Sequence, residues 1–267
     1  MSRRKFMNTA SLAVAPLAGV ATVAASTVED RTLPTPENLG ATALIETAHP
    51  RIAALSKEIS QSAGSDRAAA VLLHDWVRDQ IAFGIPPGFY ETTATEVLDA
   101  KVGYCNTKVT LFSALLRARG IPTRMRMMDL SAQVLQGLFD PGTPYVDHGI
   151  TEVFLDGRWI AVDSYVVDKP LAMAAAKKLT ARNSQAGFGV HLDGKPEWDG
   201  LTNNFIQCVN NQSISGYVLK DHGLFIDVAD FYRNAVAPRN RKTLMSGLVT
   251  RFGSSYLNQR IQAVRVS

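Results

Sequence analysis

Gly103-Tyr104-Cys105-Asn106-Thr107-Lys108-Val109 places a cysteine directly before an amphipathic run. After Cys105, apolar residues recur at the intervals of an α-helix, at Val109, Phe112 and Leu116. The sequence Gly120-Ile121-Pro122 follows and is typical of a helix end. We therefore expect a helix of about four turns that begins at Cys105. A thiol at this position faces the positive end of the helix dipole, which stabilises the thiolate form.

The composition is that of an ordinary globular protein. The chain has 267 residues, 46% of them hydrophobic and 19% charged, which is enough to bury the core of one domain or of two small ones. The formal net charge is +4, but Arg3, Arg4 and Lys5 supply three of these charges. They lie in a segment that we expect to be removed, which leaves +1 and gives no support to a nucleic-acid partner.

The chain has two cysteines, Cys105 and Cys208, which are too few for a disulfide framework. A single bridge between them is compatible with their number, but it would quench the thiol at the helix start. We therefore expect Cys208 to be buried and inert. No metal-ligand spacing occurs, because the cysteines are 103 residues apart and no two histidines are four residues apart. We expect neither a metal nor another cofactor.

Residues 1–25 have the pattern of an export signal. A basic start precedes an uncharged apolar stretch, and the small residues Val23 and Ala25 suit a cleavage site. Pro16 interrupts the stretch and argues against stable membrane insertion, although an N-terminal anchor is the alternative. Ser2-Arg3-Arg4-Lys5-Phe6-Met7 resembles the twin-arginine signal of bacteria, which implies export of the folded protein to the periplasm.

The rest of the chain divides into three parts. Residues 26–64 are expected to form a tether and a helix, since 26–38 is polar and contains two prolines. Residues 65–170 hold the clearest patterns and are expected to form the core that contains Cys105. Residues 171–267 are expected to pack on this core as a C-terminal extension. Weaker patterns there favour a helix over 170–179, a strand over 205–217 and a helix over 225–235.

A period of two replaces the helical period after Pro122. Residues 123–128 alternate and predict a strand, whereas 131–144 predict a long loop. The clearest hairpin of the chain follows. Its predicted strands, 148–155 and 158–163, flank Asp156-Gly157, a pair typical of a two-residue type I′ turn.

This turn fixes the register of the predicted hairpin. The expected pairs are Leu155–Arg158, Phe154–Trp159, Glu152–Ala161, Ile150–Asp163 and His148–Tyr165. His148 and Asp163 would then be diagonal neighbours on one face, about 7–8 Å apart at the backbone. A carboxylate there can fix the tautomer of the imidazole and leave its other nitrogen for the Cys105 thiol.

Glu152 and Tyr165 share this predicted face with His148. For Glu152, a carboxylate that supports the histidine and an ordinary solvated side chain are both compatible with the pattern. For Tyr165, a contact with substrate and simple packing both stay open. The remaining histidines of these regions are expected to be ordinary helix or loop residues, namely His74, His191 and His222.

Four blocks of the sequence resemble the transglutaminase-like superfamily. They are 74–83, 103–124, His148 and 152–163. The resemblance implies an α+β, papain-like fold, with N-terminal helices and a nucleophile-bearing helix packed on an antiparallel β-sheet. It also implies that 65–170 is the catalytic core.

Carried over position by position, the resemblance makes Cys105 the nucleophile, His148 the general base and then acid, and Asp163 the residue that orients His148. Gly149 departs from the family pattern, which often has an aromatic residue near this position. The tryptophan that helps to hold the oxyanion in eukaryotic transglutaminases has no counterpart, because Trp76 is expected in a helix core. The backbone N–H of Cys105 is then the one assigned oxyanion donor.

The chemistry that the resemblance implies is acyl transfer through a thioester of Cys105. Hydrolysis of peptide, isopeptide or side-chain amides is favoured, with a peptide or protein as the partner. Transfer to an amine, as in transglutaminases, and a non-catalytic binding module that keeps the fold stay open as alternatives. The candidate substrate contacts are Tyr104, Glu152 and Tyr165.

Overall fold

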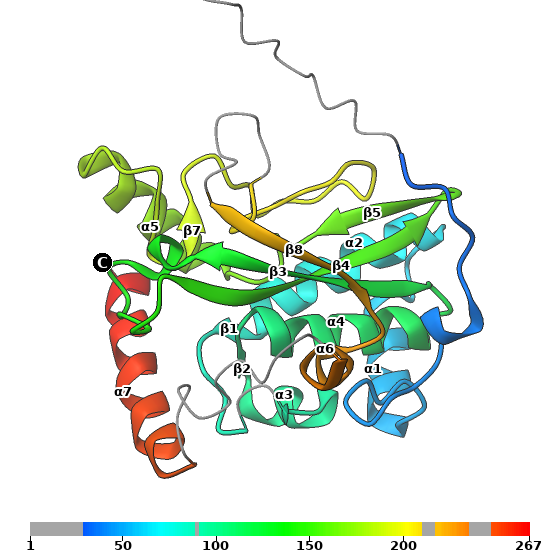
Figure 1. Ribbon diagram of the computed structural model, residues 1–267. Coiled ribbons are helices and arrows are strands. Elements are labelled where there is room, and N and C mark those ends of the chain that lie inside the picture. Colours follow the sequence, from blue (N-terminus) through cyan, green and yellow to red (C-terminus); the bar gives the residue numbers. More distant parts are fainter. Residues whose placement is uncertain (1–28, 89–90, 210–216, 235–246) are drawn as a thin grey trace, which may run out of the picture.

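The computed structural model describes residues 29–88, 91–209, 217–234 and 247–267 (Figure 1). The expected export signal at 1–25 lies outside these residues. The predicted α+β fold is confirmed, because helices pack on an antiparallel four-stranded sheet. Within the described ranges, no helix combines the length and the apolar character needed to cross a lipid bilayer.

The described residues form seven α-helices, two 3-10 turns and eight strands. The helices are α1 (Pro50–Ile59), α2 (Asp66–Gln80), α3 (Ala94–Ala100), α4 (Cys105–Ala118), α5 (Lys169–Ala181), α6 (Val228–Asn234) and α7 (Gly247–Arg265), with the 3-10 turns η1 (Pro36–Asn38) and η3 (Ala132–Leu135). The strands are β1 (Ala82–Phe83), β2 (Val102–Gly103), β3 (Thr123–Ser131), β4 (Tyr145–Leu155), β5 (Arg158–Val162), β6 (Ala186–Gly187), β7 (Val190–His191) and β8 (Val218–Phe225).

The main sheet has the strand order β5-β4-β3-β8, and every neighbouring pair in it is antiparallel. β3 and β4 pair along nine residues, from Thr123↔Val153 to Ser131↔Tyr145. The short strands β1 and β2 form a separate parallel pair. β2 ends at Gly103 and leads through Tyr104 into α4, so this small pair fixes the position where the helix starts.

α4 begins at Cys105, as the sequence predicts. It is buried from Cys105 to Arg117, because α1, α2 and α3 contact it as well as β3 and β4 (Figure 1). The sequence predicted that one apolar face of this helix is buried, whereas the structure buries the helix on all sides. Even Lys108 is fully buried; its Nζ donates to the carbonyl of Ile81 at 2.7 Å, and burial lowers its pKa to about 7.

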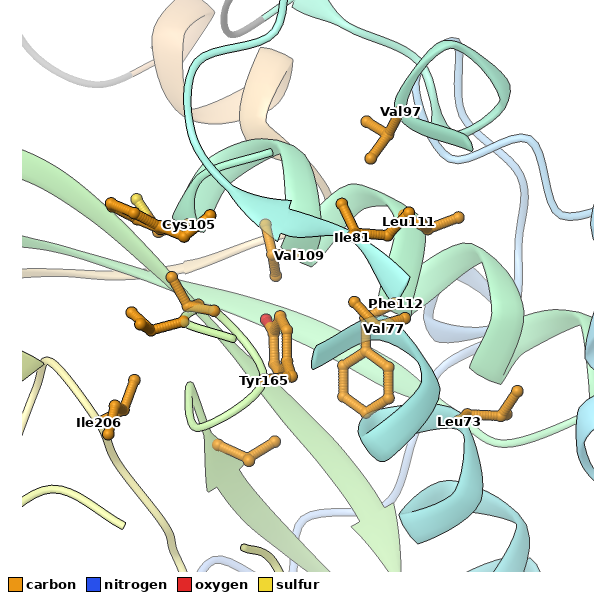
Figure 2. Packing of buried hydrophobic residues seen from close by; sticks show 14 of the residues in the cluster. Leu73, Val77, Ile81, Val97, Cys105, Val109, Leu111, Phe112, Tyr165 and Ile206 are labelled. Atoms are coloured by element: carbon orange, nitrogen blue, oxygen red, sulfur yellow. The ribbon is translucent and has the colours of Figure 1, made fainter. Parts of the chain in front are cut away.

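One continuous hydrophobic cluster surrounds this helix. Figure 2 shows Phe112 of α4 close to Val77 of α2, and Tyr165 beside Phe112. Cys105 lies at the end of the cluster where α4 starts. Burial of each large apolar side chain of this kind stabilises the folded state by about 1.5–3 kcal/mol. Because these side chains surround α4, the core fixes the position of the helix start.

The Asp156-Gly157 turn forms as expected, with φ of 51° and 79° at its two residues, the left-handed values that a type I′ turn requires. The predicted register is confirmed from the turn to Thr151↔Val162. The ladder ends there, because the backbone N–H of Asp163 donates to the carbonyl of Asn204 at 3.1 Å. The two predicted pairs beyond this point, Ile150–Asp163 and His148–Tyr165, therefore do not form in the strand ladder.

The C-terminal third agrees only partly with the sequence patterns. α5 and α6 lie where helices are predicted. The strand predicted over 205–217 is not observed at 205–209, and a strand forms at β8 instead; residues 210–216 lie outside the described ranges. α7 is tied to the core by Arg265, whose guanidinium bonds both carboxylate oxygens of Asp168 and the carbonyl of Phe83.

Candidate active site

Cys105 is the first residue of α4 and is 7% exposed. The first turn of a helix has N–H groups without intrahelical acceptors, and the helix dipole is positive there. The Cys105 sulfur lies 3.6 Å from Asn106 Oδ1 and 3.7 Å from the carbonyl oxygen of Asp147. Both contacts are long, as bonds from sulfur are, and they place the thiol between the start of α4 and strand β4.

His148, the residue after Asp147, bonds Asp163 with a distance of 2.9 Å from Nε2 to Oδ2. Both side chains are buried, with exposed fractions of 1% and 0%. A carboxylate only accepts hydrogen bonds, so the imidazole donates from Nε2. The structure thus brings together the two residues that the hairpin argument pairs, although Asp163 lies one residue beyond the end of β5.

The Asp163 carboxylate is held by backbone N–H groups as well as by His148. Its Oδ1 accepts from Ile206 at 2.5 Å, and its Oδ2 accepts from Cys208 at 2.9 Å and from Gln207 at 3.3 Å. Hydrogen bonds from backbone N–H groups to a carboxylate are charge-assisted, and together they hold the carboxylate in one orientation. Asp163 is therefore a fixed acceptor for His148 Nε2.

The charge state of His148 follows from these neighbours. Burial alone lowers the pKa of His148, but the negative charge of Cys105 and the hydrogen bonds with Asp163 and Cys105 outweigh burial and raise it to about 9. At neutral pH the imidazole is therefore protonated. The arrangement is an ordered chain of sulfur, imidazolium and carboxylate.

Residues 53–164 match the family model of the transglutaminase-like superfamily. The matched segment runs from α1 through the hairpin and contains Cys105, His148 and Asp163. No curated protein matches the chain.

Two solved structures are similar to parts of the chain. One is a candidate cysteine protease from Cytophaga hutchinsonii, with 14% identity, a TM-score of 0.44, and coverage of 72% of this chain and 47% of that chain. The other is a candidate protease from Parabacteroides distasonis, with 16% identity, a TM-score of 0.34, and coverage of 45% of this chain and 24% of that chain. The chain thus spans about half of the first protein and a quarter of the second.

Gly149, where the sequence departs from the superfamily pattern, has a steric explanation. A Cβ at this position would lie 3.0 Å from Asn106 Oδ1 and 3.0 Å from Met127 Sδ. These contacts are tighter than most real Cβ contacts, so a side chain at position 149 would require Asn106 or Met127 to shift by a few tenths of an ångström.

Two of the three predicted substrate contacts, Glu152 and Tyr165, have polar partners within the protein. Glu152 accepts from Arg124 Nε and Arg126 Nε, both at 2.6 Å, and is 5% exposed. Four residues along a strand span about 13 Å, so Glu152 belongs to an ion-pair cluster and does not support His148. Tyr165 is fully buried, and its hydroxyl bonds Thr151 Oγ1 at 2.7 Å. It packs in the core, which is the alternative that the sequence left open for Tyr165, and a substrate contact of either residue stays a prediction.

Tyr104, the third predicted contact, is the N-cap residue of α4 and packs against the hydrophobic cluster while half-buried. Its position next to Cys105 keeps it a candidate for contact with a substrate.

Both cysteines are free thiols, so the bridge considered from the sequence is not formed. Cys208 is buried, and its thiol lies 3.0 Å from Met128 Sδ. Burial, followed by the nearby charge of Asp163, raises the pKa of Cys208 well above its ordinary value. This agrees with an inert thiol, but the sequence did not reveal that the backbone of Cys208 holds Asp163.

His74, His191 and His222 each have a hydrogen-bond partner within the protein. His74 is fully buried and bonds Ser164 Oγ at 2.7 Å, next to Asp163, and Asp75 at 2.9 Å. His222 pairs with Asp129, and His191 Nδ1 accepts from the N–H of Asp193. In the part of the chain that the structure describes, no three His, Cys, Asp or Glu side chains come together as a metal site would need.

Proposed function

We propose that the protein is a cysteine-dependent acyl hydrolase that cleaves amide bonds through Cys105, His148 and Asp163. The observation that carries the proposal is the buried chain from Asp163 through His148 to the thiol at the start of α4. A nucleophile, a base within its reach and a residue that orients the base are the parts that covalent acyl transfer requires.

In the first half of the reaction, the Cys105 thiolate attacks the carbonyl carbon of the amide. The C–N bond breaks, a thioester forms on sulfur, and the leaving amine takes the proton from the His148 imidazolium. The raised pKa of His148, about 9, suits this role because the proton is already in place at neutral pH. In the second half, His148 accepts a proton from water as the water oxygen attacks the thioester; the C–S bond then breaks, which releases the acid and restores the Cys105 thiolate beside the His148 imidazolium.

Asp163 and the start of α4 supply the electrostatic support for these steps. Asp163 accepts from His148 and stabilises the imidazolium without taking its proton. The backbone N–H of Cys105 lies at the first position of α4, where a helix offers it no acceptor of its own. We assign this N–H to the oxyanion of the tetrahedral intermediate.

We infer that the substrates are peptide, isopeptide or side-chain amides, and that water is the acceptor. If residues 1–25 act as the export signal that their pattern predicts, the protein works in the periplasm. Amides of peptides and of the cell wall are then within its reach.

The test is to incubate the protein with a panel of acyl donors and to locate the adducts by mass spectrometry. Thioacyl adducts are expected on Cys105, and Cys105→Ala should abolish turnover, whereas Cys208→Ala should retain it. Amide turnover that persists in Cys105→Ala would falsify the proposed nucleophile. A labelled glutamine peptide with a primary amine tests the acceptor: acid and ammonia are expected, and an amine conjugate would assign the protein to transglutaminase-type transfer.

A further inference from the structure

Tyr232 of α6 reaches the active site from outside the segment that matches the superfamily, which ends at residue 164. Its hydroxyl donates to Asp147 Oδ2 at 2.9 Å and accepts from Asn106 Nδ2 at 3.2 Å. The helix that carries it follows strand β8, so this contact joins segments 126 residues apart in the sequence.

The two partners of Tyr232 flank the reacting pair. Asn106 follows Cys105 on α4, and Asp147 precedes His148 on β4. Both also contact the sulfur, Asn106 through Oδ1 and Asp147 through its carbonyl. One phenol hydroxyl therefore bridges the residue next to the nucleophile and the residue next to the base.

Packing alone does not account for this hydroxyl. The ring of Tyr232 makes an edge contact with Phe231, with centroids 5.0 Å apart, and a phenylalanine would preserve that contact. Asn106 is 1% exposed, so water does not reach its amide readily if the hydroxyl is removed. A buried polar group that loses its partner costs about 1–3 kcal/mol.

The charges around Tyr232 keep it a donor. Burial, followed by the negative charges and hydrogen bond around it, raises the pKa of Tyr232 well above its ordinary value, so the phenol stays protonated. The titratable groups that face it are Tyr104, Asp147 and Cys105. Its proton therefore points at the Asp147 carboxylate and reduces the effect of that negative charge on the neighbouring sulfur.

We propose that Tyr232 is a positioning residue that holds Cys105 and His148 in register and shields the thiolate from the charge of Asp147. α6, which lies beyond the superfamily match, is then part of the active site. The effect on catalysis rests on the proposed function, whereas the effect on the reactivity of the Cys105 thiol does not.

The test is the rate of iodoacetamide alkylation of Cys105 as a function of pH in Tyr232→Phe, with the adduct located by mass spectrometry. Loss of the hydroxyl leaves the Asp147 charge less compensated and disfavours the thiolate. We expect the rise in rate to move to higher pH and the rate near neutral pH to fall roughly tenfold. With an amide substrate, kcat should fall by a similar factor while KM changes little.

Two further variants separate positioning from stability. Tyr256→Phe removes the hydroxyl of a tyrosine on α7 that is 58% exposed, and it should leave the alkylation profile unchanged. In an Asp147→Asn background the effect of Tyr232→Phe should shrink, because position 147 then carries no negative charge.

An alkylation profile of Tyr232→Phe that coincides with that of the wild type overturns the proposal. So does a variant that loses unfolding stability but keeps this profile, since Tyr232 would then be structural only. If Tyr232→Phe shifts the alkylation profile but the wild-type protein turns over no amide substrate, the proposed hydrolase activity is wrong, whereas the proposed role of Tyr232 stands.

Discussion

Asp163→Asn is the sharpest test of the proposed catalytic chain, because it keeps the size of the side chain and removes its charge. The carboxylate accepts from four donors: His148 Nε2 and the N–H groups of residues 206, 207 and 208. An asparagine can keep the Ile206 N–H on its carbonyl oxygen. Its NH2 group then faces His148 and the N–H of Cys208, where only an acceptor fits.

Two losses follow from this geometry. The N–H of Cys208 loses its buried acceptor, which lowers the free energy of unfolding by about 1–3 kcal/mol. His148 must now accept at Nε2, so its remaining proton moves to the nitrogen that serves Cys105. A neutral imidazole in this tautomer cannot take the thiol proton, and turnover should fall by about 10²–10⁴-fold.

The measurements are kcat with an amide substrate and the free energy of unfolding from urea titration, both at neutral pH. Asp193→Asn is the matched control, because the Asp193 side chain is 55% exposed and its exchange should change neither quantity. An Asp163→Asn enzyme that keeps kcat within about threefold of the wild type would refute the reasoning, since this loss is far smaller than a wrong tautomer requires.

Three further predictions use other features of the site. For His148, the acid that serves the leaving amine is lost as pH rises through its pKa of about 9, so kcat/KM should decline above that pH; a decline centred near an unperturbed histidine pKa would contradict the raised value. Gly149→Ala adds a Cβ 3.0 Å from Asn106 Oδ1, and we expect a loss of about 1–3 kcal/mol in unfolding free energy with slower alkylation of Cys105; unchanged stability and alkylation would show that β4 can move away. For Lys108, burial lowers the pKa from 10.5 to about 7, so between these values the unfolded chain binds the proton and the folded one does not. The contribution of this group to the free energy of unfolding therefore rises with pH across that window. In urea titrations, the unfolding free energy of the wild type should rise by roughly 1 kcal/mol per pH unit relative to that of Lys108→Met. A difference that does not change with pH would mean that Lys108 stays charged when buried.

The sequence predicted those parts of the site that depend on local patterns. The start of α4 follows from helical periodicity, and the Asp156-Gly157 turn fixes the hairpin register as far as Thr151↔Val162. The errors begin where the alternation was extended past the end of β5. The chain leaves the ladder at Asp163, so Tyr165 enters the core and does not pair with His148.

The parts that the sequence missed depend on contacts between distant segments. β8 carries Lys220, Asp221 and His222 and is an edge strand with register shifts, so it lacks the apolar alternation that marks a strand. The donors at 206–208 and the hydroxyl of Tyr232 lie far from their partners in the chain. Neither has a periodic or motif signal, because a backbone N–H is common to nearly all residues and a lone tyrosine is usually a packing residue.

The backbone cradle of Asp163 has a consequence for the protein during its synthesis. Cys105, His148 and Asp163 have all been translated by residue 163, but the N–H of Cys208 that holds the carboxylate comes 45 residues later. A nascent chain therefore contains all three residues of the proposed triad before it contains the backbone N–H groups that hold Asp163 in place. The growing polypeptide should therefore not react with neighbouring amides until its C-terminal third has been synthesised and has folded against the core. Folding of this last part would then determine when Cys105 becomes reactive.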